Sequence, residues 1–471
     1  MHETPLEAVF DVVAGPVHAY LASLQTRRVW SDASPEEIRA VVDRPLPRKG
    51  TDPLQVVAGL ADDLEPFVTA HASGRYFGFV IGGLHPAAYG AELLAASWDQ
   101  NAGGFILAPG IAIAEEVAAR WLVELLDLPA NSSVGFVTGG QMASFTCLAA
   151  ARHEVLRAVG WDVETDGLPG APRINVVVKS DVHATIPRAL RYLGLGERCA
   201  IQVAGDDQGR MVVGELDRLL RGLQGPTIVC VEAGNVNTGA FDDFVAVADV
   251  VEAHAARGHP SWVHVDGAVG LWAAAASSHA DRTAGLERMN SWSTDGHKLL
   301  NVAYDCGIAI VRQTDAHRAA MSVHATYLVQ DGDRVRESLD WNPEFSRRAR
   351  GLGVYATLGS LGRDGVADLV ERTNALARRF AGQLTASGTA EVVNDVVFNQ
   401  VLVRWLPPEG WESSAWNDEV VARIQRDGTA YFSGTTWQGQ RMMRISVSDH
   451  TTDEADVDRA VAALLRVTEA G

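Results

Sequence analysis

The sequence predicts an α/β fold built on a mostly parallel sheet, and three short stretches carry this prediction. The stretches RINVVVKS, TIVCVEAG and SWVHVDG, at 173–180, 227–234 and 261–267, are rich in valine and isoleucine and end in polar or turn residues. Helical segments lie between such runs, for example the amphipathic EEVAARWLVELLDL at 115–128. Apolar strands separated by helices indicate a mostly parallel sheet that is covered by helices on both faces.

The segments on either side of this region differ from it. The first part of the chain is predicted to be helical, because PLEAVFDVVAGPVHAYLASL has one apolar face and Ser34 is placed to cap SPEEIRAVVDR. After residue 350 come long helical segments, two predicted strands at 390–406 and 440–450, and a last helix at 453–467. We therefore expect three domains. They are a helical N-terminal segment at 1–70, a large domain at 71–350 and a small α+β domain at 351–471.

Composition and charge argue against several classes of function. Hydrophobic residues make up 47% and charged residues 21%, which is ordinary for a soluble protein with its own core. The formal charge of −19 disfavours nucleic acid and anionic membrane surfaces. The four cysteines form no CxxC pair, which predicts reduced thiols in a cytoplasmic protein and no metal site. The acidic start is unlike a signal peptide, and no apolar run is long enough to span a bilayer.

Several polar residues follow the predicted strands, where ligands of open α/β sheets collect. Asp266 ends the run WVHVD, His183 opens the helical segment after VVVKS, and Gly139 and Gly140 form a turn before another helix. Lys298 follows in the stretch STDGHKLLN. Taken singly each has an ordinary structural explanation, such as an Asp-Gly turn, a helix-capping histidine or a tight glycine turn.

Together these residues match the needs of pyridoxal 5′-phosphate (PLP). Lys298 is an amine that can form a Schiff base, Asp266 can keep the pyridine nitrogen protonated, and the ring of His183 can stack on the cofactor. A helix N-terminus can hold the phosphate dianion. The residues expected there are Gly139, Gly140, Gln141 and Ser144. Zinc fits less well, because no ligand set has suitable spacing.

From about residue 75 onward the sequence resembles the group II PLP-dependent decarboxylases, which include aromatic-L-amino-acid, glutamate and diaminobutyrate decarboxylases. The similar motifs, in order, are RYFGFVIGGLHP, VTGGQMASF, DVHATIPRAL, GNVNTGAFDD, HVDGAVG and DGHKLLNVAYDCG. The resemblance implies a fold-type I enzyme with a seven-stranded type of sheet, acting as a homodimer with its active site at the subunit interface. It also implies that Asp295 and His297 help hold the phosphate, and that Asn235 stands where relatives often have a threonine.

The resemblance further implies that the segments at 75–86 and 98–105 line the substrate pocket. The candidate pocket residues are Phe77, Phe79, His85, Trp98 and Asn101. Their aromatic character favours an L-amino acid with a hydrophobic or aromatic side chain, although Arg75 is available to bind a distal carboxylate. Each aromatic residue, taken alone, is at least as easily explained as part of the core.

One departure from the family pattern leaves the reaction open. Aromatic amino acid decarboxylases carry a loop tyrosine that protonates the substrate carbon, and here its position falls near Ser338, which we include among the candidate pocket residues. The first hypothesis is a decarboxylase that releases CO2 and an amine. The alternatives are an aldehyde-forming or carbon–carbon lyase enzyme of the same fold, and a cofactor-binding scaffold without catalysis.

Overall fold

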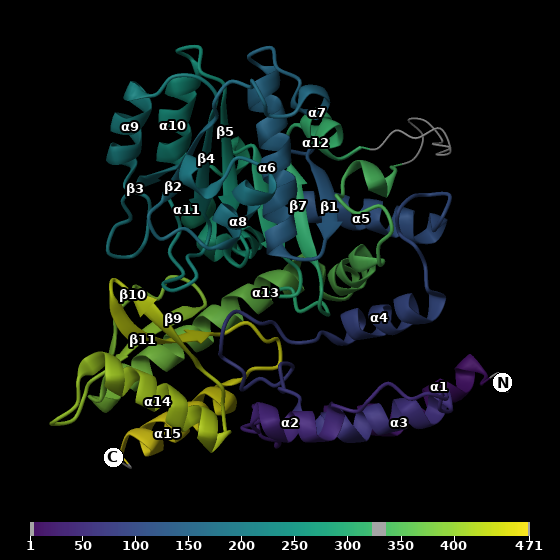
Figure 1. Ribbon diagram of the computed structural model, residues 1–471. Helices are drawn as coiled ribbons and strands as arrows, with labels where there is room; N and C mark the ends of the chain where they lie inside the picture. Colours follow the sequence, from purple (N-terminus) through teal and green to yellow (C-terminus); the bar gives the residue numbers. More distant parts are fainter. Residues whose placement is uncertain (1–3, 323–335, 470–471) are drawn as a thin grey trace. The chain divides into compact units, whose positions relative to one another are not determined.

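The computed structural model of the chain describes residues 4–322 and 336–469 (Figure 1). Within it the chain forms two compact units. The first unit contains Met1–Ile81, Arg379–Val393 and Leu402–Gly471, and the second contains Gly82–Arg378 and Asn394–Val401. The three domain boundaries expected from the sequence stay a prediction.

The second unit is built on a seven-stranded sheet with the strand order β1-β7-β6-β5-β4-β2-β3. Its strands are β1 (Ser133–Val137), β2 (Asn175–Lys179), β3 (Ala200–Val203), β4 (Thr227–Glu232), β5 (Ser261–Asp266), β6 (Ser291–Asp295) and β7 (Gly307–Val311). The pairs β2–β3, β2–β4, β4–β5 and β5–β6 are parallel, whereas β7 runs antiparallel to both β1 and β6. The predicted mostly parallel seven-stranded sheet is confirmed.

Helices of the second unit cover this sheet (Figure 1). The helices of this unit are α4 (Pro86–Trp98), α5 (Pro109–Leu125), α6 (Gly140–Arg157), α7 (Val163–Asp166), α8 (Thr185–Tyr192), α9 (Val213–Gly222), α10 (Phe244–Ala255), α11 (Ala280–Thr283) and α12 (Thr314–Met321), of which α6, α8, α9 and α10 lie against the sheet. The longest helix, α13 (Arg350–Ser387), has residues in both units and is interrupted at Gly362, whose φ of +62° is not helical.

Both faces of the seven-stranded sheet are buried, as the valine-rich strands require. Val176 and Val178 of β2 belong to an apolar cluster with residues of α6, α8 and α12. Val177 lies between them and points to the opposite face, yet it is also fully buried. A strand that is apolar on both faces has no alternation of polar residues, which explains why these runs are so uniform in sequence.

The first unit combines helices with a four-stranded sheet of order β10-β11-β9-β8. Its strands are β8 (Ala390–Val392), β9 (Gln400–Trp405), β10 (Ser433–Trp437) and β11 (Gln440–Ser446), and its helices besides α13 are α1 (Leu6–Ser23), α2 (Pro35–Val42), α3 (Pro53–Leu64), α14 (Ser413–Asp427) and α15 (Glu454–Glu469). The predicted cap is present, since Ser34 and Glu37 form a reciprocal capping box at the start of α2. No residue of α1, α2 or α3 is buried within the single chain.

Candidate active site

Four polar residues end neighbouring strands of the seven-stranded sheet. They are Lys179 of β2, Glu232 of β4, Asp266 of β5 and Asp295 of β6. The pairs β2–β4, β4–β5 and β5–β6 are parallel, so their carboxyl ends meet at one edge of the sheet. All four residues are buried at this edge.

Lys298 lies three residues beyond the end of β6. Its Nζ is 2.9 Å from Oδ2 of Asp295, and one fifth of its side chain is exposed. The backbone of the same turn is packed closely against Gly82, since a Cβ at that position would collide with the carbonyl oxygen of Lys298. The amine is therefore held by a carboxylate, while its backbone is fixed by a glycine from a distant part of the sequence.

Asp295 also faces His297. The imidazole Nδ1 of His297 accepts a hydrogen bond of 3.1 Å from the backbone N–H of Cys306, so its Nε2 carries the proton in the neutral ring. That Nε2 is 3.6 Å from Oδ1 of Asp295, and burial lowers the pKa of His297, which favours the neutral form. Oδ1 of Asp295 itself is buried and has no hydrogen bond within the described residues.

The glycine turn before α6 lies against Asp295. A Cβ on Gly140 would lie 2.7 Å from Oδ2 of Asp295, and a Cβ on Gly307 would overlap the backbone of Gly139. Gly307 is in register with Asp295 of β6 and with Val137 of β1, which explains this close approach. Among the described residues no side chain caps the N-terminus of α6, and a helix N-terminus is a position where backbone N–H groups can bind an anion.

The other two residues predicted for the phosphate turn are engaged elsewhere in the second unit. The side-chain amide of Gln141 donates a hydrogen bond of 3.2 Å to the backbone carbonyl of Thr185. The buried hydroxyl of Ser144 lies 3.2 Å from the hydroxyl of Ser293 and joins α6 to β6. Gln141 thus connects the phosphate turn to the segment that follows His183.

Asp266 and His183 are linked through Thr185. Nδ1 of His183 lies 2.9 Å from Oγ1 of Thr185, and this hydroxyl donates a long hydrogen bond of 3.5 Å to Oδ2 of Asp266. Oδ1 of Asp266 accepts a hydrogen bond of 3.2 Å from the backbone N–H of Ala268. Thr185 was missed by the sequence reasoning, which treated only the histidine two residues earlier as functional.

The charge of Asp266 depends on opposing influences. Burial raises the pKa of Asp266 above its ordinary value. The nearby His183 and Lys298 oppose this rise, whereas the negative charge of Glu232 adds to it. A buried carboxylate beside such groups is suited to hold a proton on a ligand nitrogen.

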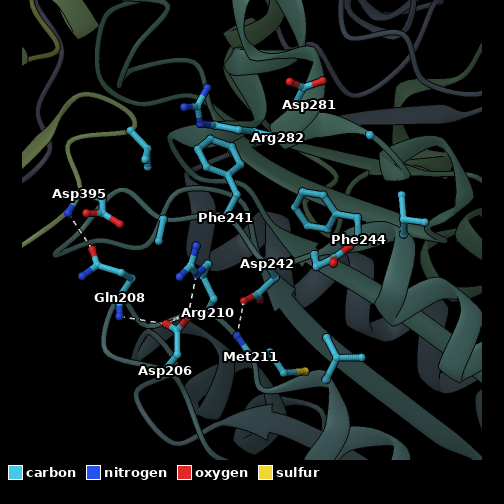
Figure 2. A pocket seen from close by; sticks show the side chains of 16 residues that line it. Asp206, Gln208, Arg210, Met211, Phe241, Asp242, Phe244, Asp281, Arg282 and Asp395 are labelled. Atoms are coloured by element: carbon cyan, nitrogen blue, oxygen red, sulfur yellow. Dashed lines mark hydrogen bonds and ion pairs between the residues drawn. The ribbon is translucent and has the colours of Figure 1, made fainter.

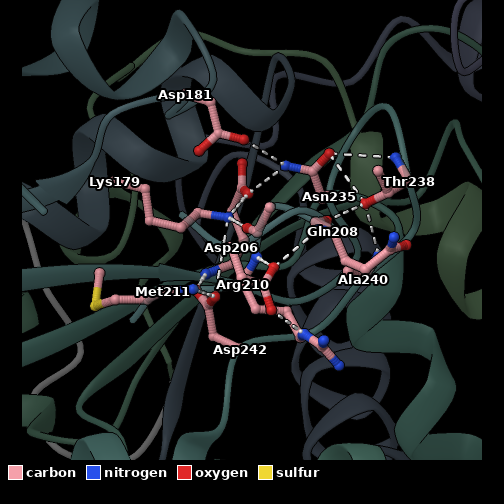
Figure 3. A network of polar contacts seen from close by, with 12 residues as sticks. Lys179, Asp181, Asp206, Gln208, Arg210, Met211, Asn235, Thr238, Ala240 and Asp242 are labelled. Carbon is pink, nitrogen blue, oxygen red and sulfur yellow. Dashed lines mark hydrogen bonds and ion pairs between the residues drawn. The ribbon is translucent and has the colours of Figure 1, made fainter. Parts of the chain in front are cut away.

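Asn235 lies in a polar network that adjoins the site (Figure 3). Its side-chain nitrogen donates hydrogen bonds of 3.0 Å to Glu232 and 3.3 Å to Asp181, and its Oδ1 accepts from the backbone N–H of Thr238 at 3.2 Å. Asn235 therefore contacts the carboxylates of Glu232 and Asp181. Its role at the cofactor stays a prediction.

A cavity of about 500 Å³ lies beside this network (Figure 2). Arg210 on its wall pairs with Asp206 at 2.7 Å, and Phe241 and Arg282 face the same space. Its lining includes none of the residues that the sequence predicts for the active site, all of which lie in the described part of the chain. This cavity is therefore distinct from the candidate site around Lys298.

The predicted pocket residues are dispersed. Phe77 belongs to the core of the first unit, where its ring centroid is 4.9 Å from Phe380, and Phe79 of the same unit is more than half exposed. The remaining four belong to the second unit. There His85 caps α4, and Trp98 is half-exposed at the end of that helix. Asn101 accepts a hydrogen bond from the backbone N–H of Gly103. Ser338 is fully buried and its hydroxyl donates a hydrogen bond to Glu115. Their contribution to substrate binding stays a prediction.

The site residues fit PLP. The glycine turn opens a helix whose N-terminus has no side-chain cap among the described residues, Lys298 supplies an amine, and Asp266 is a buried carboxylate. Within the residues that the structure describes, no group of three or more His, Cys, Asp or Glu side chains is arranged to hold a metal ion. None of the helices described is both long and apolar enough to cross a membrane.

Comparison with known proteins identifies the family. Residues 35–405 match the profile described as the pyridoxal-dependent decarboxylase conserved domain. The chain belongs to this family. It is a PLP-dependent carboxy-lyase, as the sequence motifs predicted, and the architecture of its solved neighbours confirms the fold-type I prediction.

Relatives of this decarboxylase cover nearly the whole chain. The L-2,4-diaminobutyrate decarboxylase of Rhizobium meliloti (strain 1021) is 29% identical over an alignment 475 residues long. The alignment covers 93% of this chain and 92% of the relative. The structure of Oryza sativa TDC with PLP and tryptamine has a TM-score of 0.90 and 24% identity, and covers 99% of both chains. The structure of Rhodiola rosea 4-hydroxyphenylacetaldehyde synthase has a TM-score of 0.86 and 20% identity, and covers 99% of this chain and 98% of that one.

Proposed function

We propose that this decarboxylase acts on an L-amino acid with a hydrophobic or aromatic side chain and releases CO2 and an amine. The observation that carries the proposal is the meeting of the Lys298 amine, the Asp266 carboxylate and the uncapped N-terminus of α6 at one edge of the sheet. In this assignment Lys298 is the residue whose amine would hold the cofactor. When bound, PLP supplies the electron sink that makes loss of CO2 possible.

Each residue of the site then has a defined task. Asp266 holds a proton at the ring nitrogen, because its Oδ atoms are buried and fixed by Ala268 and Thr185. His183 lies within hydrogen-bond distance of Thr185, which would orient its ring to stack on the cofactor. The first turn of α6 binds the phosphate, and Asp295 holds the Lys298 amine when that amine is not joined to the cofactor.

We also propose that the working enzyme is a homodimer. Large apolar side chains of α4, α5 and the segment between them are exposed in the single chain. They are Leu93, Leu94, Trp98, Ile106, Leu107 and Ile113. An apolar surface of this kind is expected to be covered by a partner. The unburied helices α1 to α3 would be covered in the same way.

The nature of the substrate is supported by indirect observations. The half-exposed Trp98 and the exposed Phe79 are aromatic residues in the two segments that the family resemblance assigns to the pocket. One solved neighbour is described with tryptamine, an aromatic amine. A cytoplasmic location is part of the same proposal, supported by four cysteines that form no disulfide.

A second candidate function is aldehyde formation by coupled decarboxylation and oxidative deamination, which consumes O2 and releases peroxide and ammonia as well as CO2. Ser338, near the expected position of the loop tyrosine, is buried and its hydroxyl donates to Glu115 at 3.2 Å. It therefore does not present a phenol-like acid to a substrate. One solved neighbour is described as a 4-hydroxyphenylacetaldehyde synthase. Residues 323–335, where the rest of this loop falls, lie outside the described residues.

Product analysis tests the two candidates against each other. Purified enzyme with added PLP would be incubated with aromatic, aliphatic, acidic and diamino acids, and CO2, amine, aldehyde and peroxide would be measured. The proposal expects amine in a 1:1 ratio to CO2 with an aromatic or aliphatic substrate. Aldehyde and peroxide in equal amounts, without amine, would establish the second candidate. Turnover confined to an acidic or diamino acid would reject the proposed substrate class.

A further inference from the structure

A second lysine, Lys179, lies close to the cofactor site and is buried. The sequence contains only three lysines, which are Lys49, Lys179 and Lys298. Lys179 ends β2 and only 1% of it is exposed, whereas Lys49 is at the surface. A buried ammonium is costly unless it is paired, so its partners indicate why it is there.

The partners of Lys179 are carboxylates and a carbonyl (Figure 3). Its Nζ donates short hydrogen bonds to Oε2 of Glu232 and to the carbonyl of Gly209, and it lies 3.9 Å from Oδ1 of Asp242. The oxygens of Asp242 are already bound by backbone N–H groups, at 2.6 Å from Met211 and 2.7 Å from Glu232. Glu232 is therefore the principal counter-ion of Lys179.

Glu232 is next to Asp266. The two residues end the neighbouring parallel strands β4 and β5 and are paired in register. Such neighbours lie about 4.8 Å apart along the sheet, and their side chains leave it on the same face. Two adjacent carboxylates in a buried site disfavour each other's ionisation. In this site the electrostatic influence of Glu232 does act on Asp266 and raises its pKa.

The groups that face Asp266 come from four parts of the second unit. They are His183 before α8, Glu232 and Cys230 of β4, Lys298 after β6, and Cys147 of α6. Burial raises the pKa of both thiols well above neutrality, so neither contributes charge. Among these groups Glu232 is the one that opposes ionisation of Asp266 by its charge, and Lys179 is the cation bound to it.

We propose that Lys179 is a positioning residue of the cofactor site. Its ammonium neutralises Glu232, so that Asp266 remains ionised and keeps its negative charge available to the ring nitrogen of PLP. The proposal rests on the proposed role of Asp266. Lys179 does not touch the reacting atoms and acts only through Glu232 and Asp266.

The same pairing prevents Lys179 from competing with Lys298 as a nucleophile. Burial acts to lower the pKa of Lys179, but Glu232, Asp242 and Asp181 together raise it above its ordinary value. The amine is therefore held as an ammonium ion without a free electron pair. Of Lys179 and Lys298, only Lys298 is then chemically available.

The test measures PLP affinity rather than activity alone. Apoenzyme would be titrated with PLP between pH 6 and pH 9, and binding followed by visible absorbance, for Lys179→Met, Glu232→Gln and the double variant. In Lys179→Met an uncompensated Glu232 makes Asp266 harder to ionise, so we expect affinity to fall at least tenfold at pH 6 and to recover towards pH 9. The double variant, which has neither charge, should bind within about threefold of the parent. Lys49→Met removes a surface lysine and should bind like the parent.

Each result decides the proposal. It is overturned if Lys179→Met binds PLP like the parent across this pH range, or if the double variant is as weak as Lys179→Met. If Lys179→Met does not fold, Glu232→Gln alone decides: its binding should persist to lower pH than in the parent, and an unchanged pH dependence would reject the proposal. Asp266→Asn tests the role of Asp266 separately from that of Lys179. If this variant bound PLP like the parent, Asp266 would have no role in binding the cofactor.

Discussion

Nζ of Lys298 lies 2.9 Å from Oδ2 of Asp295, three residues earlier in the chain, and Gly140 lies against that same Oδ2. The amine that we assign to the Schiff base and the turn that we assign to the phosphate are therefore connected by one carboxylate.

Borohydride reduction of the PLP-bound enzyme should attach the cofactor to Lys298 alone. Lys179 is held as an ammonium by Glu232 and Asp242, and Lys49 is at the surface. Peptide mapping by mass spectrometry should find the pyridoxyl mass on the peptide that contains residue 298. Lys298→Ala should abolish the adduct and Lys49→Met should retain it. An adduct on Lys179 would contradict the assignment.

Replacing Gly140 with alanine should weaken PLP binding by about tenfold or more, which corresponds to about 1.4 kcal/mol. The added Cβ would lie 2.7 Å from Oδ2 of Asp295 and displace the carboxylate that holds Lys298. Gly214→Ala in the first turn of α9 is a matched control, because its Cβ would meet no atom within 4 Å. Affinity would be measured by absorbance titration, and equal values for the two variants would argue against close packing at residue 140.

Thr185→Val should lower kcat by about 2–10-fold while the protein stays folded. The substitution removes the hydroxyl that links His183 to Asp266 but keeps the shape of the side chain. A typical intramolecular hydrogen bond contributes about 0.5–1.5 kcal/mol, and the 3.5 Å length of the bond to Asp266 keeps it in this range although its acceptor is a carboxylate. Thr185→Ser keeps the hydroxyl and should recover most of the activity. A serine variant as slow as the valine variant would show that the methyl group matters instead.

Asp266→Asn should stabilise the cofactor-free protein at neutral pH although it weakens PLP binding. Burial raises the folded-state pKa of Asp266. There is therefore a pH range in which the carboxyl is protonated in the folded protein but ionised in the unfolded chain. Stability from this group therefore falls as pH rises from the ordinary value of aspartate through the raised folded-state pKa. Asparagine does not ionise, so the variant loses no stability in this way. We expect the thermal unfolding midpoint of Asp266→Asn at pH 7 to be about 1–2 °C above that of the parent. A lower midpoint than the parent would contradict this account.

The buried ion pair between Arg347 and Glu115 should be essential for stability. Both side chains are fully buried, and Glu115 also accepts from Ser338 at 3.2 Å and from the backbone of Gly351 at 3.2 Å. Arg347→Met should cost about 3–5 kcal/mol, because it leaves a buried carboxylate uncompensated. Chemical denaturation would measure this loss. The double variant with Glu115→Gln should be more stable than Arg347→Met alone.

The strands with continuous valine runs could be predicted from the sequence, but those whose polar residues are satisfied by tertiary contacts could not. The run QVLVRW at 400–405 is a strand, yet the single strand expected at 390–406 is divided into β8 and β9. Asn394 between them donates its side chain to the carbonyls of Thr238 and Gln400, which favours a turn there. Similarly β6 reads SWSTD and is fully buried, because Ser291 and Ser293 bond to Trp262 and Ser144.

The same limit applies to the site. Lys298, Asp266 and His183 are recognisable because each follows a strand or turn in a known order. Thr185 meets Asp266 across 81 positions, and Lys179 meets Glu232 across 53. No short sequence motif contains both members of either pair. Their contacts arise from the order of the strands in the sheet, not from the spacing of residues along the chain. The roles of the site residues and the domain boundaries remain predictions for experiment.

The scarcity of lysine has a practical consequence for handling the molecule. Of the three lysines only Lys49 is exposed, because Lys179 is buried and four fifths of the Lys298 side chain is covered. Reagents that acylate primary amines should therefore place a fluorophore or a surface tether at Lys49 before any other lysine. Molecules attached through Lys49 would share one orientation and keep their catalytic amine unmodified.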